Sequence, residues 1–461
     1  MNNFDVIVVG GGNAGLCAAL AAIEHCSKVL LVERSPLEFR GGNSKYTRDI
    51  RCAHENPDNY AHGSYSEEEF ADDLLKVTGG KTNEKLAKLV IHESSFVPEW
   101  MEKQGIKWQK PLSGTLHMSR TNRFFLGGGK ALINTYYARA EKLGVQIMYD
   151  STIENLLIEN GVFKSAVVVT REHKNTLTSR SIVMAAGGFE ANIGWLKEYW
   201  GAAANNFIIR GSRYNDGKIL KSLMICGAKI TGDPRGVHAV AVDARSPRFD
   251  GGIITRVDSL PFGIVVNKRG ERFFDEGEDL WPKRYAIWGK LIAEQPEQMA
   301  YSVIDSKVLG KFLPPLFEAL RSDTIPGLAK LMDVDQGRFL ETVETFNWHL
   351  SKGSRFDPGI LDDCRTKGVD PPKTHWAIAL DTPPFLAYPL RPGITFTYLG
   401  VAVNSNANIL ATDGEAYPNV FAAGEIMAGN ILTKGYLAGF GLTIGTAFGR
   451  IAGKGASQAA A

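Results

Sequence analysis

The 461-residue sequence predicts an α/β fold in which both ends of the chain build one parallel sheet and an α+β domain is inserted between them. Two observations predict this arrangement. Residues 4–33 run through an apolar strand, a glycine turn, an Ala-rich helix and a second apolar strand, the pattern of a βαβ unit. The same rhythm returns after residue 385, whereas residues 234–384 lose it and are richer in charged, proline and aromatic residues. We therefore expect a first domain made of residues 1–233 and 385–461, and a capping domain at 234–384.

The first glycine turn has the pattern of a dinucleotide-binding loop. Gly10, Gly12 and Gly15 follow the first strand at the G-x-G-x-x-G spacing, and Glu33 ends the second strand. The first glycine permits the tight turn, the second lets a pyrophosphate approach the backbone, and the third lets helix and strand pack closely. The next helix offers its N-terminal N–H groups to phosphates. A carboxylate at Glu33 suits a ribose hydroxyl better than a 2′-phosphate, so we expect a Rossmann-like domain that binds FAD or NAD; a purely structural glycine turn is the alternative.

Composition excludes several classes of protein. A hydrophobic content of 44% and a charged content of 22% are typical of globular proteins, and a net charge of +2 disfavours a nucleic-acid partner. No apolar run reaches about 18 residues, so we expect no direct membrane span. The apolar run at the N-terminus carries Asp5 and lacks the features of a signal peptide. The five cysteines show neither metal-ligand nor disulfide spacing, so we expect a cytoplasmic protein without a bound metal.

A second glycine loop follows Glu33. Gly41–Ser44 forms a loop of small residues whose backbone can lie against a ligand, and Arg48 and Arg51 come directly after it. These two arginines are candidates for binding an acidic ligand. The alternative is that they form solvated ion pairs with Asp49 or Glu55.

A third glycine-rich stretch begins a helix near residue 131. Gly127–Gly129 precede it, and Arg120 and Arg123 come just before the glycines. The helix start favours an anion, and both arginines can bind one. The alternative is a flexible helix entry with two surface arginines.

Together these motifs resemble the FAD-binding flavoproteins of the fumarate reductase and succinate dehydrogenase family, which also includes soluble ketosteroid dehydrogenases. The stretches that carry the resemblance span nearly the whole chain: the Gly10, Gly12, Gly15 and Glu33 fingerprint, Gly41–Ser44, Ala185–Phe189, Arg272–Glu276, Asn419–Glu425 and Tyr436–Arg450. Within the family the sequence is most similar to tricarballylate dehydrogenases. That closer likeness lies in Arg40–Ser44 with Thr47 and Arg48, in Leu75–Glu84, and in Asp275–Asp279 with Trp281–Tyr285.

The resemblance implies FAD as the cofactor and gives a set of residues that hold it. Glu425 would accept a hydrogen bond from the ribityl chain, and the last helix would direct its positive end at the flavin. Membrane-bound members attach the flavin through a histidine in the loop that is Gly41–Arg48 here, and this loop has none. Non-covalent FAD is therefore expected, bound by Gly10, Gly12, Asn13, Ala14, Gly15, Glu33, Arg34, Gly42, Asn43, Ser44, Gly187, Gly188, Asp216, Glu425, Gly441, Leu442 and Thr443.

The sequence departs from the family at the positions that bind substrate. Tyr436 stands where fumarate reductases carry an arginine, and Thr395 where they carry a histidine. The proton-transfer arginine of the family maps to Arg284 only if a short insertion is allowed. A plain fumarate or succinate enzyme is therefore not expected. We expect Arg284 and Tyr436 to be catalytic, and the substrate-binding residues to be Arg48, Arg51, Arg120, Arg123, Arg391 and Thr395.

The resemblance implies oxidation of tricarballylate (propane-1,2,3-tricarboxylate) to cis-aconitate, by removal of a proton α to a carboxylate and transfer of a hydride to the flavin. Such protons are very weakly acidic, so clustered cations must stabilise the developing charge. A reaction on another unsaturated carboxylate, or on a cyclic ketone polarised by Tyr436, is the alternative within the enzymes. A non-catalytic flavin-binding module is an alternative of another class. The chain has no cysteine cluster for iron–sulfur centres, so an external electron acceptor is expected, and the resemblance implies a membrane-associated iron–sulfur protein.

Overall fold

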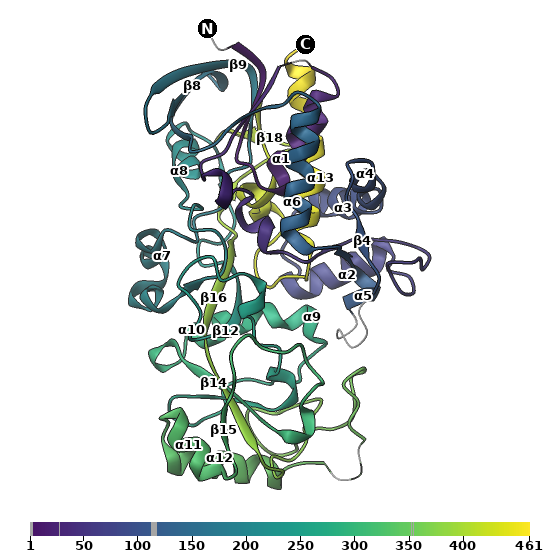
Figure 1. Cartoon of the computed structure of the whole chain (residues 1–461), viewed down its shortest axis with the longest axis vertical. Helices are drawn as coiled ribbons and strands as arrows, with labels where there is room; N and C mark the ends of the chain where they lie inside the picture. The colour runs from purple at the N-terminus through teal and green to yellow at the C-terminus, as the bar shows by residue number, and fades with distance from the viewer. Residues whose placement is uncertain (1–2, 27, 112–117, 352, 354) are drawn as a thin grey trace.

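The computed structural model describes residues 3–26, 28–111, 118–351, 353 and 355–461 (Figure 1). It contains two main sheets, one near each end of an elongated molecule, and both chain termini lie beside the first sheet. The strands of the first sheet are β1 (Asn3–Val9), β2 (Val29–Val32), β6 (Gln146–Met148), β7 (Thr152–Glu159), β8 (Val162–Val169), β9 (Lys174–Met184), β18 (Asn408–Leu410) and β19 (Ala416–Ala422).

Five strands of the first sheet run parallel in the order β19-β9-β1-β2-β6. The strands nearest the glycine turn, β1 and β2, are almost entirely buried, as parallel strands covered on both faces must be. β7 and β8 extend β9 as an antiparallel ribbon. Near the end of the chain β19 pairs with β9, and β9 pairs with β1 at the start of the chain, so the sheet is built from both chain ends. The α/β fold expected from the sequence is confirmed.

A stripe of glycines lets the last helix join the first. The helix α13 (Phe440–Ala459) packs along α1 (Asn13–Ile23) in the upper part of Figure 1. A Cβ atom added at Gly449 would lie 2.5 Å from the carbonyl oxygen of Ala14, and one at Gly453 would lie 2.2 Å from that of Ala18. Only glycine permits so close an approach of the two backbones. This contact positions the start of α13 beside the N-terminal glycine turn.

The second sheet is mostly antiparallel and centres on one long strand. That strand is β16 (Phe385–Thr397), which pairs with four others, and β13 extends the sheet beyond β14. The other strands are β10 (Ile208–Ile209), β12 (Val237–Asp243), β13 (Ile264–Asn267), β14 (Ala300–Asp305) and β15 (Leu320–Ser322). A second apolar core lies between this sheet and two helices, α11 (Ile325–Met332) and α12 (Gln336–Trp348). The domain limits at 233/234 and 384/385 stay predictions.

Two small sheets, eleven further α-helices and nine short 3₁₀ helices complete the described chain. The small sheets are β3 (Asp49–Arg51) with β4 (Trp108–Gln109) and β5 (Asn122–Phe125), and β11 (Ile230–Thr231) with β17 (Gly400–Val401). The helices are α2 (Glu67–Thr78), α3 (Glu84–Ser94), α4 (Val97–Lys103), α5 (Met118–Thr121), α6 (Gly128–Lys142), α7 (Ile193–Trp200), α8 (Lys218–Ile225), α9 (Trp281–Arg284), α10 (Trp288–Ala293), α11 (Ile325–Met332) and α12 (Gln336–Trp348). Among the described helices, none has both the length and the apolar character that crossing a membrane requires.

Candidate active site

A long cavity runs from the first glycine turn to the junction of the two main sheets. Its volume is about 1570 Å³, counting the part open to solvent. One end is formed by the turn after β1, by Glu33 and by Asp216, and the other by side chains from β12, β16, the segment before α10 and the loop before α13. The predicted residues that line it are Gly10, Gly12, Asn13, Ala14, Glu33, Arg34, Gly42, Asn43, Ser44, Gly187, Asp216, Thr395, Glu425, Tyr436, Gly441 and Leu442.

The glycine turn exposes backbone to the cavity on the side from which a ligand would approach. A Cβ at Gly12 would meet nothing nearer than the Ser44 hydroxyl at 3.7 Å, so this position faces open space. Gly15 is different, because its Cβ would lie 1.8 Å from the carbonyl oxygen of Gly10. Gly15 therefore allows α1 to pack against β1. It is not among the described residues that line the cavity.

The acidic residue at the end of β2 is held by backbone donors. The carboxylate of Glu33 accepts hydrogen bonds from the N–H of Gly11 at 2.9 Å and of Ser35 at 2.8 Å. Next to it, Arg34 forms an ion pair with Asp216, which lies two residues before α8. These three predicted residues thus form one wall at the same end of the cavity.

The middle of the cavity is bordered by a network around Asn43. Its amide nitrogen donates to Glu190 at 2.7 Å, to the carbonyl oxygen of Thr395 at 2.6 Å and to Glu425 at 3.3 Å. Glu425 also accepts from the N–H of Thr397 at 2.8 Å. Burial raises the pKa of both glutamates, and in Glu425 the neighbouring Glu190 raises the pKa further. The network fixes the loop of Gly42 and Asn43 to the end of β16.

Tyr436 lies in the loop before the last helix. Its hydroxyl oxygen accepts a hydrogen bond from the N–H of Gly441 at 2.7 Å, and its own proton is therefore available to another acceptor. Burial raises the pKa of Tyr436, so the phenol is neutral. Thr443 lies deeper, where its hydroxyl donates to the carbonyl oxygen of Arg51, and it is not among the described lining residues.

Arg210 is the cation at this end whose charge is least compensated. It follows β10, is 6% exposed and donates from Nε to the hydroxyl of Thr395 at 2.8 Å. Its Nη1 atom is buried and has no hydrogen-bond partner among the described residues. Burial, then the charge of Arg256, and less strongly that of Arg48, lower the pKa of Arg210 to about 10. A buried guanidinium that keeps a donor unused is suited to bind an anion, because leaving it unpaired is costly.

His238 and two tyrosines form an aromatic group beside Arg210. The ring of His238, on β12, stacks on Tyr436 with centroids 4.0 Å apart, and its Nε2 lies 3.2 Å from the hydroxyl of Tyr285. Burial, and then the charges of Arg210 and Arg256, hold the pKa of His238 well below its usual value. The imidazole is therefore neutral, and its Nε2 can accept a hydrogen bond from the Tyr285 hydroxyl.

Two further arginines border the same end of the cavity. Arg256 lines it, forms a buried ion pair with Asp258 at 2.7 Å and lies over the ring of Tyr285 at 4.7 Å. Arg48 is paired with Asp49 at 3.1 Å and donates to the sulfur of Met118 at 3.2 Å. Both of those partners line the cavity, so Arg48 lies directly behind the wall.

The other predicted cations lie outside the cavity in the described chain. Arg120 pairs with Glu69, and Arg123 with Asp58 at 2.6 Å. Arg391, on β16, donates to the carbonyl oxygen of Glu297 at 3.1 Å. Each of these arginines already has an acceptor of its own.

Arg51 and Arg284 are also held by protein partners. Arg51 is fully buried and donates to the carbonyl oxygen of Ala438 at 3.0 Å. Arg284, at the end of α9, forms an ion pair with Glu278, whereas the next residue, Tyr285, faces the cavity. Gly188 packs against Thr397 and Glu425, where a Cβ has no room.

Four residues of this end were not among the predicted site residues: Arg210, His238, Arg256 and Tyr285. A signal exists for two of them. Arg210 directly follows the apolar pair Ile208–Ile209, and polar residues at strand ends often reach a ligand. His238 interrupts a fully buried strand, where a lone polar side chain needs a partner. Nothing in the local sequence distinguishes Arg256 or Tyr285 from their neighbours.

The sequence is similar to several known proteins. A family model described as an FAD binding domain matches residues 5–442. A probable fumarate reductase, Ifc3, of Shewanella frigidimarina is 27% identical over 471 residues, which cover 98% of this chain and 74% of that protein. The NADH:fumarate oxidoreductase of Klebsiella pneumoniae is also 27% identical, over 93% of this chain but only 45% of that protein.

Solved structures share the fold. The open conformation of a flavocytochrome c3 fumarate reductase matches all of this chain and 79% of that chain, with a TM-score of 0.75 and 23% identity. A 3-ketosteroid Δ4-(5α)-dehydrogenase from Rhodococcus jostii matches 99% of this chain and 97% of that chain, with a TM-score of 0.75 and 22% identity. At these identities, the two similarities show a shared fold.

Proposed function

This chain belongs to the FAD binding domain family, and from that premise we propose that it is an FAD-dependent dehydrogenase that oxidises tricarballylate to cis-aconitate. The chain is an FAD-dependent oxidoreductase acting on carbon–carbon bonds. The observation that supports a tricarboxylate substrate is Arg210, a buried guanidinium with an unused donor at one end of the cavity.

The residues present fit FAD. Open space in front of Gly12 allows a pyrophosphate to reach the backbone, and α1 begins directly behind it at Asn13. The carboxylate of Glu33 keeps lone pairs for a ribose hydroxyl beside its two backbone bonds. We propose that Gly42, Asn43, Ser44 and Glu425 hold the remainder, without a covalent bond. When bound, FAD supplies the two-electron acceptor for the hydride that leaves the substrate.

Three guanidinium groups suit a substrate with several carboxylates. Arg210 has no carboxylate partner among the described residues, whereas Arg256 shares Asp258 and Arg48 shares Asp49. The three arginines outnumber these two carboxylates, and His238 is neutral, so this part of the site carries excess positive charge. We propose that Arg210 binds one carboxylate directly and that Arg256 and Arg48 bind or attract the others.

The cations also make the chemistry feasible. Removal of a proton α to a carboxylate places negative charge on that carboxylate in the transition state. Preorganised donors in a site that excludes water stabilise such charge most effectively. The hydroxyl of Tyr436 has a proton available for the same carboxylate. Thr395 contributes by orienting Arg210 through its hydroxyl.

Two neighbouring residues are candidates for the proton transfer. Arg284 is the residue that the resemblance indicates, but it is paired with Glu278. The Tyr285 hydroxyl faces the cavity and lies within hydrogen-bond distance of the neutral His238. Burial raises the pKa of Tyr285 to about 12, and the charge of Arg256, which lies over the ring, opposes that rise. We therefore propose Tyr285, with His238 behind it, as the proton-transfer group. Arg284 is the alternative, and variants of both residues compare the two assignments.

The reduced cofactor must pass its electrons to an external acceptor. Among the described residues no group of three or more metal-ligating side chains could hold a metal ion. We propose that the acceptor is a separate protein, with a membrane-associated iron–sulfur protein as the first candidate.

Turnover with an artificial electron acceptor tests the proposed function. Purified holoenzyme is assayed with tricarballylate, succinate and a 3-ketosteroid, and the product is identified by mass spectrometry. We expect cis-aconitate from tricarballylate and at least a hundredfold lower kcat/KM with the other two. A preference for the 3-ketosteroid would instead assign Tyr436 to a ketone carbonyl. Turnover of neither class would reject the proposal.

A further inference from the structure

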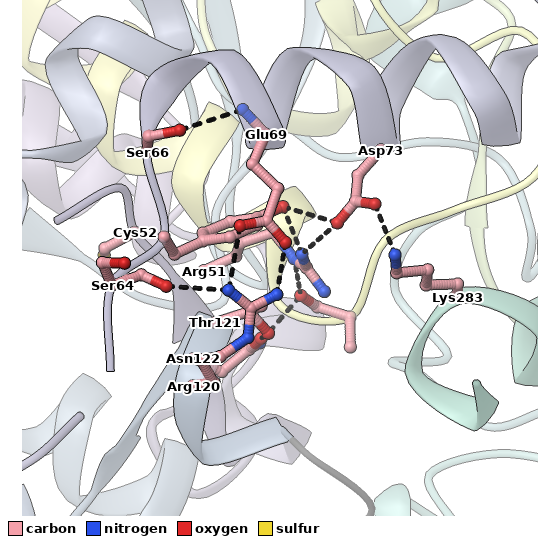
Figure 2. Close-up of polar contacts among 12 residues, drawn as sticks. Arg51, Cys52, Ser64, Ser66, Glu69, Asp73, Arg120, Thr121, Asn122 and Lys283 are labelled. Atoms are coloured by element: carbon pink, nitrogen blue, oxygen red, sulfur yellow. Dashed lines mark hydrogen bonds and ion pairs between the residues drawn. The ribbon is translucent and has the colours of Figure 1, made fainter. Parts of the chain in front are cut away.

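A buried carboxylate on α2 lies behind the active site and binds cations from two different segments. Asp73 is 5% exposed, and its Oδ1 accepts a hydrogen bond from the ammonium group of Lys283 at 2.5 Å. Its Oδ2 accepts from the hydroxyl of Tyr65 at 2.9 Å and lies 3.6 Å from Nη1 of Arg51. Figure 2 shows Lys283 and Arg51 reaching Asp73 from opposite sides.

The first of these segments leads to Tyr436. Arg51 donates from Nε to the carbonyl oxygen of Ala438, two residues after Tyr436. The amide of Asn122 donates to the same carbonyl oxygen at 2.8 Å. Because Arg51 is fully buried and also bonded to Tyr65 at 2.6 Å, it has little freedom to move. The position of the Tyr436 loop therefore depends on how Arg51 is held.

The second segment leads to Tyr285. Lys283 lies two residues before Tyr285, on the short helix α9. The same segment is tied to α2 a second time, because Lys76 donates to Asp279 at 2.5 Å. It also reaches Arg256 indirectly, since the indole of Trp281 donates to Asp258 at 2.7 Å. The segment therefore carries one cavity residue and supports another.

We infer that Asp73 is a positioning residue that fixes the Tyr285 and Tyr436 segments relative to each other across the cavity. One carboxylate oxygen accepts the charge-assisted hydrogen bond of Lys283. The other holds Arg51 through a 3.6 Å ion pair and through Tyr65, which accepts from Arg51 at 2.6 Å and donates to Asp73 at 2.9 Å. This inference rests on the proposed function only in assigning chemical roles to the two tyrosines. The link between the two segments is a property of the protein itself.

A purely structural ion pair is the alternative, and the same helix provides the control. Glu69 lies one turn before Asp73 on α2 and pairs with Arg120, whose Nη1 also donates to the carbonyl oxygen of Ser64. That pair is about 40% exposed on each side, and its contact with the Asp73 link is limited to the Arg120 guanidinium over the ring of Tyr65, 5.6 Å from the centroid. Glu69→Gln removes the same charge from the same helix as Asp73→Asn, but it leaves the Asp73 link intact.

Hydrogen–deuterium exchange tests the link whatever the substrate proves to be. In Asp73→Asn we expect at least fivefold faster amide exchange at both 279–288 and 435–442. In Lys283→Met we expect it only at 279–288, because Arg51 keeps its partner. Lys283→Arg and Glu69→Gln should exchange like wild type in both segments. Wild-type exchange in both Asp73→Asn and Lys283→Met would overturn the inference.

Kinetics test the positioning role. Lys283→Met retains the buried Arg51–Asp73 pair, so it is the variant to use if Asp73→Asn does not fold. We expect its limiting rate of flavin reduction by tricarballylate to fall at least tenfold, while the substrate dissociation constant changes less than threefold. Lys283→Arg should restore at least half of the rate. A wild-type rate in Lys283→Met would overturn the inference. Absence of flavin reduction in the wild type would reject only the proposed function, and the exchange experiment would still decide on the link.

Discussion

The ring of His238 lies on the ring of Tyr436, with centroids 4.0 Å apart and an angle of 25° between the planes. His238 belongs to a strand of the second sheet, and Tyr436 to the loop that begins α13 beside the first sheet. This contact therefore joins the two halves of the molecule at the active site. Because burial, and then the charges of Arg210 and Arg256, hold the pKa of His238 well below its usual value, the imidazole is neutral and the positive charge of the site lies on the arginines.

Arg210 is expected to contribute most of the affinity for substrate. Arg210→Gln keeps a polar side chain but removes the charge, and truncating a buried charged partner costs about 2 kcal/mol or more. The dissociation constant for tricarballylate should therefore rise by at least about thirtyfold. Spectral titration of the oxidised holoenzyme measures it. Arg338→Gln, a charge removal at an exposed pair with Glu271 and Glu341, should bind like wild type.

Tyr285 is expected to control the proton transfer. Tyr285→Phe removes the hydroxyl that bonds to His238 and should lower the limiting rate of flavin reduction by about 10²- to 10⁴-fold. Arg284→Gln, next to it in the chain, should lower this rate by less than about tenfold, because Arg284 is bonded to Glu278. Stopped-flow measurements on both variants compare the two assignments directly. The reverse order of effects would make Arg284 the proton-transfer group.

The buried His238 makes stability depend on pH in a defined window. Burial, and then Arg210 and Arg256, hold the pKa of this histidine well below 6.5. As the pH falls below that value, His238 takes up a proton in the unfolded chain but stays neutral in the folded protein. The unfolded state then binds more protons, and the free energy of unfolding falls as pH drops below about 6.5, by at most about 1.4 kcal/mol per pH unit. Above that pH His238 does not make the free energy of unfolding depend on pH.

His238→Phe tests this dependence while keeping a ring on Tyr436. Urea unfolding of the apoprotein at pH 5.5 and pH 7.5 gives the change in free energy for each protein. We expect a smaller loss of stability at pH 5.5 in His238→Phe than in wild type. Equal losses would show that His238 is protonated in the folded protein.

Two glycines of the first turn are expected to differ in their effects. Gly12→Ala places a methyl group in the open space reserved for the cofactor, so it should fold normally but bind FAD at least about tenfold more weakly. Gly15→Ala places a methyl group 1.8 Å from the carbonyl oxygen of Gly10 and should destabilise the protein itself. Thermal unfolding of both apoproteins, with FAD titration by fluorescence, separates the two effects. Normal FAD binding by Gly12→Ala would place the pyrophosphate elsewhere.

Much of the fold follows from local sequence patterns. The apolar strand before Gly10 and the acidic end of the second strand predict the nucleotide end of the cavity, because each side chain acts within its own βαβ unit. The stripe of Gly445, Gly449 and Gly453 explains why the last helix can return to the first. These features are encoded over short distances, so the sequence reveals them.

The substrate end could not be predicted in the same way. Arg210, His238 and Tyr285 come from three segments that only the second sheet and α9 bring together. Arg120 and Arg284 looked equally suitable in the sequence, and their carboxylate partners became visible only in three dimensions. Which arginine is left without a carboxylate partner depends on tertiary packing, and motif spacing does not contain that information.

Anaerobic titration of the yellow holoenzyme with tricarballylate tests the central claim most directly, because it needs no external electron acceptor. We predict that the oxidised flavin band of the wild type bleaches completely at saturating substrate and that one cis-aconitate forms for each flavin reduced. Arg210→Gln with normal FAD content should need at least about thirty times more substrate for half-maximal bleaching. A flavin that stays oxidised with tricarballylate, or that bleaches equally well in Arg210→Gln, would contradict the account.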